Sequence, residues 1–157
     1  MFLNDMYEME KEAHEIAKKL IKKYIGKNML EVGCGDEKFM EEISKIYDIN
    51  IICIDPYGHG KNIIRMRGEE IEKLNKKFDL IYTIMSFHHI EDAKKFLKGV
   101  KNSLKENGKI IIIDWKNGVY TGVPEYYYSL KEVIEMMKDY KIIEAKEEKY
   151  HFYIVAS

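Results

Sequence analysis

The sequence predicts a doubly wound α/β domain, in which helices cover both faces of a mostly parallel sheet in three layers. Two observations predict this class. Amphipathic helical patterns alternate with short apolar runs along nearly the whole chain. The first apolar run ends in Glu31 and a paired-glycine turn, Gly33-Cys34-Gly35, and then opens a helix. Glycines allow the sharp swing from a parallel strand into a helix, so a ligand is expected at this strand's carboxyl end.

The helices and strands follow from the spacing of apolar residues. A helix is expected over Asp5–Tyr24, where apolar residues recur at three- and four-residue steps, and Gly26 stops it. Further helices are expected over 37–46, after the cap Asp92, and after the cap Ser129. The expected strands are 30–32, 49–54, 62–66, 78–84, 109–115, 141–145 and 151–156, with a turn at Asn107-Gly108 before the fifth of them.

Composition excludes several classes of protein. Hydrophobic residues make up 46% of the 157 residues and charged residues 34%, and no apolar run approaches the roughly 20 residues of a membrane span. Charged residues interrupt any secretory signal at the start, so we expect a cytoplasmic protein. The net charge is −1 with Lys and Glu intermixed, which argues against a nucleic-acid partner. Heavy use of Lys, Glu and Ile suits a hot-growing organism.

The two cysteines, Cys34 and Cys53, are too few for a disulfide scaffold or a zinc cage. Each lies in or beside a predicted strand, and we expect both to be small buried hydrophobic residues. His59 lies between two glycines with no second ligand at a fitting spacing, so no metal site is predicted.

A second acid follows the next strand. Asp55 comes twenty residues after the glycine turn and is followed by Pro56. An acid at this place can accept hydrogen bonds from both ribose hydroxyls of a nucleoside, although a turn acid before proline is the alternative. The next segment, Tyr57–Gly60, is too short for the usual helical crossover, so we expect a reduced third strand.

The residues around the glycine turn narrow the ligand. A dinucleotide fingerprint needs a third glycine, and Lys38 occupies that place. Asp36 and Glu37 add two carboxylates, which would repel phosphate but not a sulfonium or ammonium group. A phosphate-free nucleoside with a positive end is therefore expected, and S-adenosylmethionine fits. An ordinary glycine turn in an unrelated α/β protein is the alternative.

The stretch resembles the first motif of class I S-adenosylmethionine-dependent methyltransferases, acid-x-Gly-x-Gly, except that Glu37 stands where the family usually has another glycine. The resemblance implies a single domain over 1–157, with an N-terminal helix (1–26) and a Rossmann-like core (27–157). It also implies the strand order 3-2-1-4-5-7-6, with only the seventh strand antiparallel. The implied product is S-adenosylhomocysteine.

The stretch Met85 to Asp92 contains a His-His pair after an apolar strand. It resembles the second motif of the small-molecule branch, which includes the ubiquinone and menaquinone biosynthesis methyltransferases. Near residue 68 the family has an acid that meets adenine, and Arg67 stands in its place. Adenine contacts are then expected from Gly68 and Glu69. The cofactor-binding residues implied in total are Glu31, Gly33, Cys34, Gly35, Asp36, Asp55, Pro56, Gly68, Glu69, Met85 and Ser86.

Candidate catalytic residues lie at the predicted strand ends. If the acceptor is a hydroxyl, thiol or acidic carbon, a base helps, and the candidates are His88, His89 and Asp114. Histidine has the better pKa for this task, although each histidine could instead only orient the backbone. The loop Lys116–Tyr128 is rich in tyrosine. Its rings could attract a sulfonium over the pocket mouth or simply pack the loop onto the body.

The sequence thus favours a methyltransferase acting on an unidentified small molecule, since motifs typical of amine or pyrimidine methylation in macromolecules are absent. Two alternatives remain. A non-catalytic S-adenosylmethionine-binding module would explain Glu37, Arg67 and the missing crossover helix. A nicotinamide-binding oxidoreductase domain is disfavoured by Lys38 and by the lack of a substrate domain. The oligomeric state is not predicted.

Overall fold

A computed structural model describes residues 3–119, 121–122 and 125–157. It contains one seven-stranded sheet in the order β3-β2-β1-β4-β5-β7-β6, as predicted. The strands are β1 (Met29–Val32), β2 (Ile51–Ile54), β3 (Ile63–Ile64), β4 (Phe78–Ile84), β5 (Leu104–Trp115), β6 (Ile142–Glu147) and β7 (His151–Ala156). The pairs from β3 to β5 are parallel, and β7 is antiparallel to both β5 and β6. The predicted fold class is confirmed.

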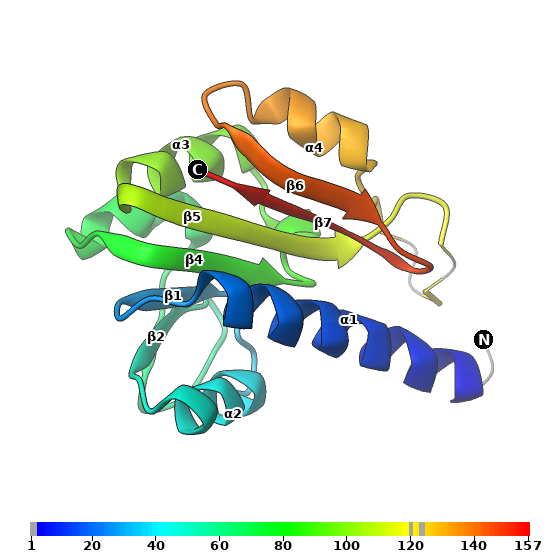
Figure 1. The fold of residues 1–157 in the computed structure, drawn as a ribbon, viewed down its shortest axis with the longest axis horizontal. Coiled ribbons are helices and arrows are strands. Elements are labelled where there is room, and N and C mark those ends of the chain that lie inside the picture. The colour runs from blue at the N-terminus through cyan, green and yellow to red at the C-terminus, as the bar shows by residue number, and fades with distance from the viewer. Residues whose placement is uncertain (1–2, 120, 123–124) are drawn as a thin grey trace.

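The helices cover both faces of this sheet (Figure 1). They are α1 (Leu3–Tyr24), α2 (Lys38–Tyr47), α3 (Ala93–Asn102) and α4 (Leu130–Met136), together with the 3₁₀ helices η1 (Gly68–Leu74) and η2 (Phe87–His89). Apolar residues of α1 and α2 pack with one face of β1, β2, β4 and β5, whereas η1, α3 and α4 pack on the other face. The two faces therefore have separate cores, as expected for a three-layer domain.

The local signals for helix starts operate as predicted. The Asp92 carboxylate accepts a hydrogen bond from the N–H of Lys95, and Ser129 with Glu132 forms a reciprocal capping box. No described helix is both long enough and apolar enough to cross a membrane.

Two segments depart from regular parallel-sheet geometry, one as predicted and one not. No helix connects β2 to β3, and β3 has only two residues, so the pared-down edge is confirmed. The turn expected at Asn107-Gly108 is instead an irregularity inside β5, which begins at Leu104. Its register against β4 slips between Phe78 and Leu80, and Asn107 adopts φ +65°. A left-handed Asn followed by Gly can bulge a strand as well as reverse it.

Candidate active site

The carboxyl ends of β1, β2 and β4 surround a cavity of about 460 Å³. Its lining includes Gly33, Asp55, Pro56, Gly68, Glu69, Ser86 and His89, all of them predicted site residues. Parallel strands end at a common edge, which explains why residues so distant in sequence gather here. Tyr7 of α1 does not line this cavity and is 67% exposed.

The glycine turn is shaped by its neighbours. Gly33 adopts φ +80°, and a Cβ there would lie 2.4 Å from Ser86 Oγ. That hydroxyl donates to the carbonyl oxygens of Gly33 and Ile84 at 3.0 and 3.2 Å. Gly35 also has a positive φ, but no atom lies within 4 Å of where its Cβ would be. The turn is therefore tight against β4 on one side and open on the other, where a ligand can approach.

Asp55 links the turn to β2. One of its carboxylate oxygens accepts a hydrogen bond from Gly35 N–H at 3.1 Å and the other from Tyr57 N–H at 2.8 Å. Each carboxylate oxygen can accept a further bond, so the predicted role toward two ribose hydroxyls is compatible with this geometry. Asp55 thus lines the cavity in a fixed orientation.

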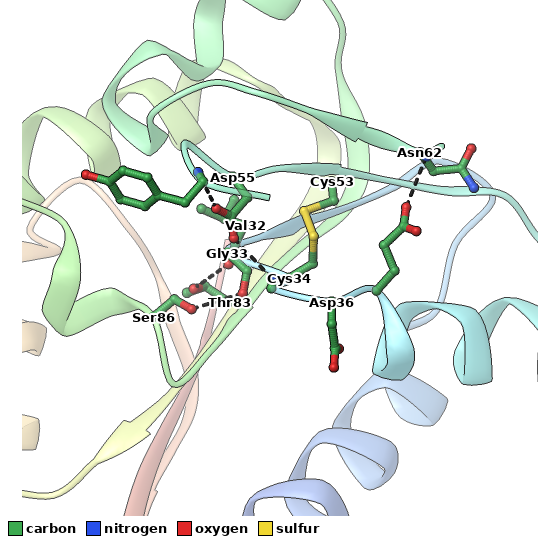
Figure 2. The surroundings of a disulfide bond; sticks show 12 residues. Val32, Gly33, Cys34, Asp36, Cys53, Asp55, Asn62, Thr83 and Ser86 are labelled. Atoms are coloured by element: carbon green, nitrogen blue, oxygen red, sulfur yellow. Dashed lines mark hydrogen bonds between the residues drawn. A yellow bond between two sulfur atoms is a disulfide. The ribbon is translucent and has the colours of Figure 1, made fainter. Parts of the chain in front are cut away.

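A disulfide joins Cys34 to Cys53 (Figure 2), with their Cα atoms 6.2 Å apart. The prediction that both are merely small buried hydrophobic residues is wrong. Residue counts could not reveal the pairing, because it depends on the parallel register that puts Glu31 beside Cys53. The bond ties the glycine turn to β2 two residues before Asp55, so two segments that contain predicted cofactor-binding residues are covalently linked.

Glu31 lies in β1, two residues before Gly33, and is only 3% exposed. Its Oε1 has no hydrogen-bond partner. Burial, reinforced by the charges of Asp55 and Asp36, raises the pKa of Glu31 to about 7, and the nearby hydroxyl of Tyr82 opposes part of this shift. A cationic group placed nearby would favour the carboxylate. The buried unpaired oxygen and the open side of Gly35 therefore both fit a positively charged ligand.

The structure explains why Glu37 can stand where the family usually has glycine. It adopts φ +68°, a conformation that favours glycine, yet its side chain folds back and is 8% exposed. Its Oε1 accepts a hydrogen bond from Asn62 N–H at 3.0 Å, and a Cβ on Gly60 would lie 2.3 Å from its carboxylate. The side chain thus holds the short β2–β3 connection that replaces a crossover helix.

Five predicted cofactor residues are not among those that line the cavity: Glu31, Cys34, Gly35, Asp36 and Met85. Asp36 is on the surface, where it accepts a bond from Lys38 N–H, and Met85 donates its N–H to Ile113 O with φ +60°. Arg67 lines the cavity and pairs with Glu69 and Glu91 at 3.4 and 2.8 Å. Glu69 is therefore held by Arg67 at the edge of the cavity.

The three predicted catalytic residues come together beside the cavity. His88 Nδ1 lies 2.8 Å from Asp114 Oδ1, and His88 N–H donates to Asp114 Oδ2 at 2.8 Å. Both side chains are nearly buried, at 5% and 3% exposure. His89 is exposed and reaches the cavity. Strand β5 supplies Asp114 and the short helix η2 supplies both histidines.

Glu125 completes this cluster, and sequence reasoning missed it. Its Oε2 lies 3.0 Å from His88 Nε2, and its Oε1 lies 3.8 Å from His89 Nδ1. Burial alone would lower the pKa of His88, but hydrogen bonds and charges of Asp114 and then Glu125 raise it. One signal was available: Glu125 is the sole carboxylate residue in the stretch 116–128.

The aromatic loop packs largely onto the body. The ring of Tyr127 lies 5.0 Å from that of His88 and 6.4 Å from Trp115, and Tyr128 contacts Phe87 at 5.5 Å. Tyr126 is 61% exposed. The packing alternative is thus confirmed for Tyr127 and Tyr128. Tyr120 and Pro124, also part of that prediction, lie outside the described residues.

This fold, with acids at the ends of β1 and β2 around a glycine turn, is the arrangement that the methyltransferase resemblance predicted. The chain matches the family model described as "Methyltransferase domain" over residues 4–156, and it belongs to that family. The resemblance predicted from the motifs is therefore confirmed.

Two curated relatives come from Ilyobacter polytropus. Malonyl-[acyl-carrier protein] O-methyltransferase 2 is 29% identical over 149 residues, which cover 78% of this chain and 58% of the relative. Malonyl-[acyl-carrier protein] O-methyltransferase 1 is 30% identical over 149 residues, which cover 77% and 55%. The chain thus spans little more than half the length of these relatives.

Two solved structures share the fold. A SAM-dependent methyltransferase from Aquifex aeolicus superposes with a TM-score of 0.69 at 24% identity, covering 88% of this chain and 87% of that one. The N-methyltransferase NodS from Bradyrhizobium japonicum, in complex with S-adenosylhomocysteine, gives 0.74 at 15% identity, covering 94% and 86%. Family and fold together support S-adenosylmethionine as the cofactor, as the sequence predicted.

Proposed function

We propose that this chain transfers the methyl group of S-adenosylmethionine to a small-molecule acceptor. The observation that carries the proposal is the cavity at the strand ends, which Asp55 and the glycine turn line together, with the buried, unpaired carboxylate oxygen of Glu31 two residues before Gly33. Acids in this position suit a nucleoside with a positive end and would disfavour a pyrophosphate. We also propose that residues 1–157 act as one domain.

Each element of the site has a proposed binding role. Asp55 would accept hydrogen bonds from the ribose hydroxyls, and Gly33 and Gly35 would let the ligand approach the backbone. Gly68 and Glu69 line the same cavity and would contact the adenine. Glu31 would compensate the positive methionine end, because its carboxylate is otherwise buried without a full set of partners.

Bound there, S-adenosylmethionine supplies an electrophilic methyl group, whose bond to sulfur breaks as the acceptor's new bond forms and the sulfur leaves as a neutral thioether. Much of the catalysis can come from holding the reactants in line. The protein's own chemical task is to take the acceptor's proton. Asp114 fixes His88 through Nδ1, so Nε2 is the atom that can receive this proton.

The pair His88–Glu125 sets the condition for that step. Nε2 and Oε2 lie 3.0 Å apart, so the Glu125 carboxylate stabilises a proton on Nε2. His88 can act as a base only after this proton leaves, and its pKa is raised. Turnover would then increase with pH through a value above the ordinary 6.5 of histidine. His89→Ala should lower turnover more than cofactor affinity, since His89 is exposed at the cavity edge.

The first test is calorimetric titration with S-adenosylhomocysteine. Wild-type protein should bind in the micromolar range, Asp55→Ala should lose most of this binding, and Asp139→Ala, an exposed acid outside the cavity, should retain it. No detectable heat in wild-type protein would refute the cofactor assignment. Equal binding by Asp55→Ala would place the nucleoside elsewhere.

A non-catalytic binding module is the second candidate. Arg67 beside the cavity, in place of the family's acid, favours it. Glu37 does not favour the binding module, because its side chain supports the short connection between β2 and β3. A methyl-transfer screen against mixed metabolites distinguishes the two: cofactor binding without turnover in any pool would favour the module. The nicotinamide alternative gains nothing from the family match.

The acceptor is proposed to be a free small molecule. The curated relatives are named for malonyl-acyl-carrier protein, but the chain spans little more than half of their length. A net charge of −1 offers no overall basic field for an acidic carrier protein or nucleic acid. We further propose a cytoplasmic location in a hot-growing organism, where structural disulfides also occur inside cells. A midpoint of thermal unfolding in the mesophilic range would contradict the latter.

A further inference from the structure

His88, His89 and Glu125 bring three metal-ligating atoms to one place. These atoms all lie within 4.8 Å of one another. The separation from Glu125 to His88 Nε2 is 3.0 Å and that to His89 Nδ1 is 3.8 Å. Donors that each lie 2.0 to 2.2 Å from a zinc-sized ion are roughly 3 to 3.5 Å apart. Small adjustments of the two exposed side chains would therefore complete a coordination sphere.

The buried histidine is already oriented for this task. Asp114 bonds to His88 Nδ1 at 2.8 Å and is itself held by the N–H groups of His88 and Trp115. A carboxylate on the second ring nitrogen is the usual support of a metal-bound histidine, because it fixes the tautomer and makes the ligating nitrogen more basic. Nε2 is consequently aimed at Glu125, with the imidazole nearly buried at 5% exposure.

The donor set also indicates which ions would bind. Two imidazole nitrogens and one carboxylate favour zinc, iron, cobalt or nickel over magnesium or calcium, which prefer oxygen donors. Two neutral histidines with Glu125 and Asp114 ionised carry a charge of −2, so a divalent cation would neutralise the cluster.

We propose that His88, His89 and Glu125 form a binding site for a divalent transition-metal ion, with Asp114 as the positioning residue for His88. Three protein ligands leave at least one coordination position open. His89 lines the nucleoside cavity, so that position would be near the methyl acceptor and could accept its oxygen. An ion on His88 Nε2 would occupy the nitrogen proposed above as the base, so in metal-loaded protein the ion would activate the acceptor in place of that proton transfer. Use of the ion toward an acceptor rests on the proposed function, whereas metal binding does not.

The test uses tag-free, chelator-treated protein titrated with Co²⁺ in the absence of cofactor. Cobalt bound to nitrogen and oxygen ligands gives visible absorption bands, and its paramagnetism quenches nearby tryptophan fluorescence. Trp115 is the single tryptophan of the chain, and the ring of Tyr127 lies between it and His88, at 6.4 and 5.0 Å. Both signals should saturate together at one ion per chain.

Variants then assign the ion to this site. His89→Ala and Glu125→Gln change exposed side chains and should each weaken Co²⁺ binding at least tenfold. The matched controls His59→Ala and Glu135→Gln, exposed residues outside the cluster, should bind as wild type does. Asp114→Asn should weaken binding as well, with circular dichroism confirming that it folds.

Three results would overturn the proposal: no saturable signal with Co²⁺ in large excess over the protein; binding unchanged in both cluster variants; or binding lost equally in the controls. None of these results bears on S-adenosylhomocysteine binding, which is measured separately in metal-free protein. Failure of the metal site and failure of the proposed function are therefore distinguishable.

Discussion

The carboxylate of Glu37 accepts a hydrogen bond from the backbone N–H of Asn62, which lies 25 residues further along the chain. Glu37 precedes α2, and Asn62 directly precedes β3. One side chain therefore supports a connection that in most parallel sheets is supported by a packed helix. The residue that departs from the family's glycine pattern is thus coupled to the other unusual feature of this chain, its reduced sheet edge.

This coupling predicts an order of stabilities at position 37. Glu37→Ala keeps the left-handed backbone and loses the bond to Asn62, so it should be destabilised by about 1–3 kcal/mol. Glu37→Gly loses the same bond but relieves the backbone strain, and should be about 1 kcal/mol more stable than Glu37→Ala. Urea unfolding measures both. An alanine variant as stable as wild type would contradict the role assigned to the side chain.

Glu31 predicts a pH-dependent difference in stability. Its pKa is about 7 in the folded protein against an ordinary 4.5. A raised folded pKa gives stability that is present below pH 4.5 and lost as the pH rises through 7. Glu31→Gln should abolish this loss, making the variant more stable than wild type at pH 8 by up to about 3 kcal/mol relative to their difference at pH 4.

The same substitution should weaken S-adenosylhomocysteine binding, because Glu31 would no longer compensate a positive ligand group. Denaturant unfolding at both pH values, together with calorimetry, checks the two effects. If the difference in unfolding free energy between Glu31→Gln and wild type is the same at pH 4 and pH 8, burial does not raise the pKa of Glu31.

The fold class and the gathering of Asp55, His88 and Asp114 at strand ends could be predicted from local patterns, because parallel strands end at one sheet edge. The strand order was implied by the family resemblance, and the pairing of His88 with Asp114 was not predicted. Other features depend on tertiary register. The disulfide needs β1 and β2 in alignment, and Glu125 reaches His88 only through the path of a loop with no periodic pattern. The extension of β5 through Asn107 was hidden because Asn-Gly is typical of turns and of bulges alike.

Removal of the disulfide should lower both stability and cofactor affinity. The bond spans 19 residues, for which loop-closure entropy predicts about 3 kcal/mol of stabilisation. The double variant Cys34→Ser/Cys53→Ser should unfold at a lower temperature than oxidised wild type. It should also bind S-adenosylhomocysteine more weakly, because Cys34 lies within the glycine turn. Scanning calorimetry and titration calorimetry measure these effects.

Wild-type protein treated with a reductant is the control for that experiment, since it should behave like the double variant without any change of sequence. Identical unfolding temperatures for oxidised and reduced wild-type protein would mean that the bond contributes nothing to the folded state.

Asp114→Asn should lower the pKa of His88, since the bond to Asp114 is the main influence that raises it. Glu125→Gln should lower it less. NMR titration of the His88 ring protons measures both values. A raised histidine pKa gives stability that is present below pH 6.5 and lost as the pH rises through the folded value, so Asp114→Asn should flatten that part of the stability profile. If the pKa of His88 is unchanged in Asp114→Asn, the Asp114 carboxylate does not stabilise the protonated imidazole.

The disulfide has a topological consequence for α2. Because Cys34 precedes this helix and Cys53 follows it, the whole of α2 lies within a closed covalent ring. A protease that cleaves after the exposed Lys45 would open the ring without dividing the molecule, so the nicked chain would migrate as one species until dithiothreitol released its two fragments.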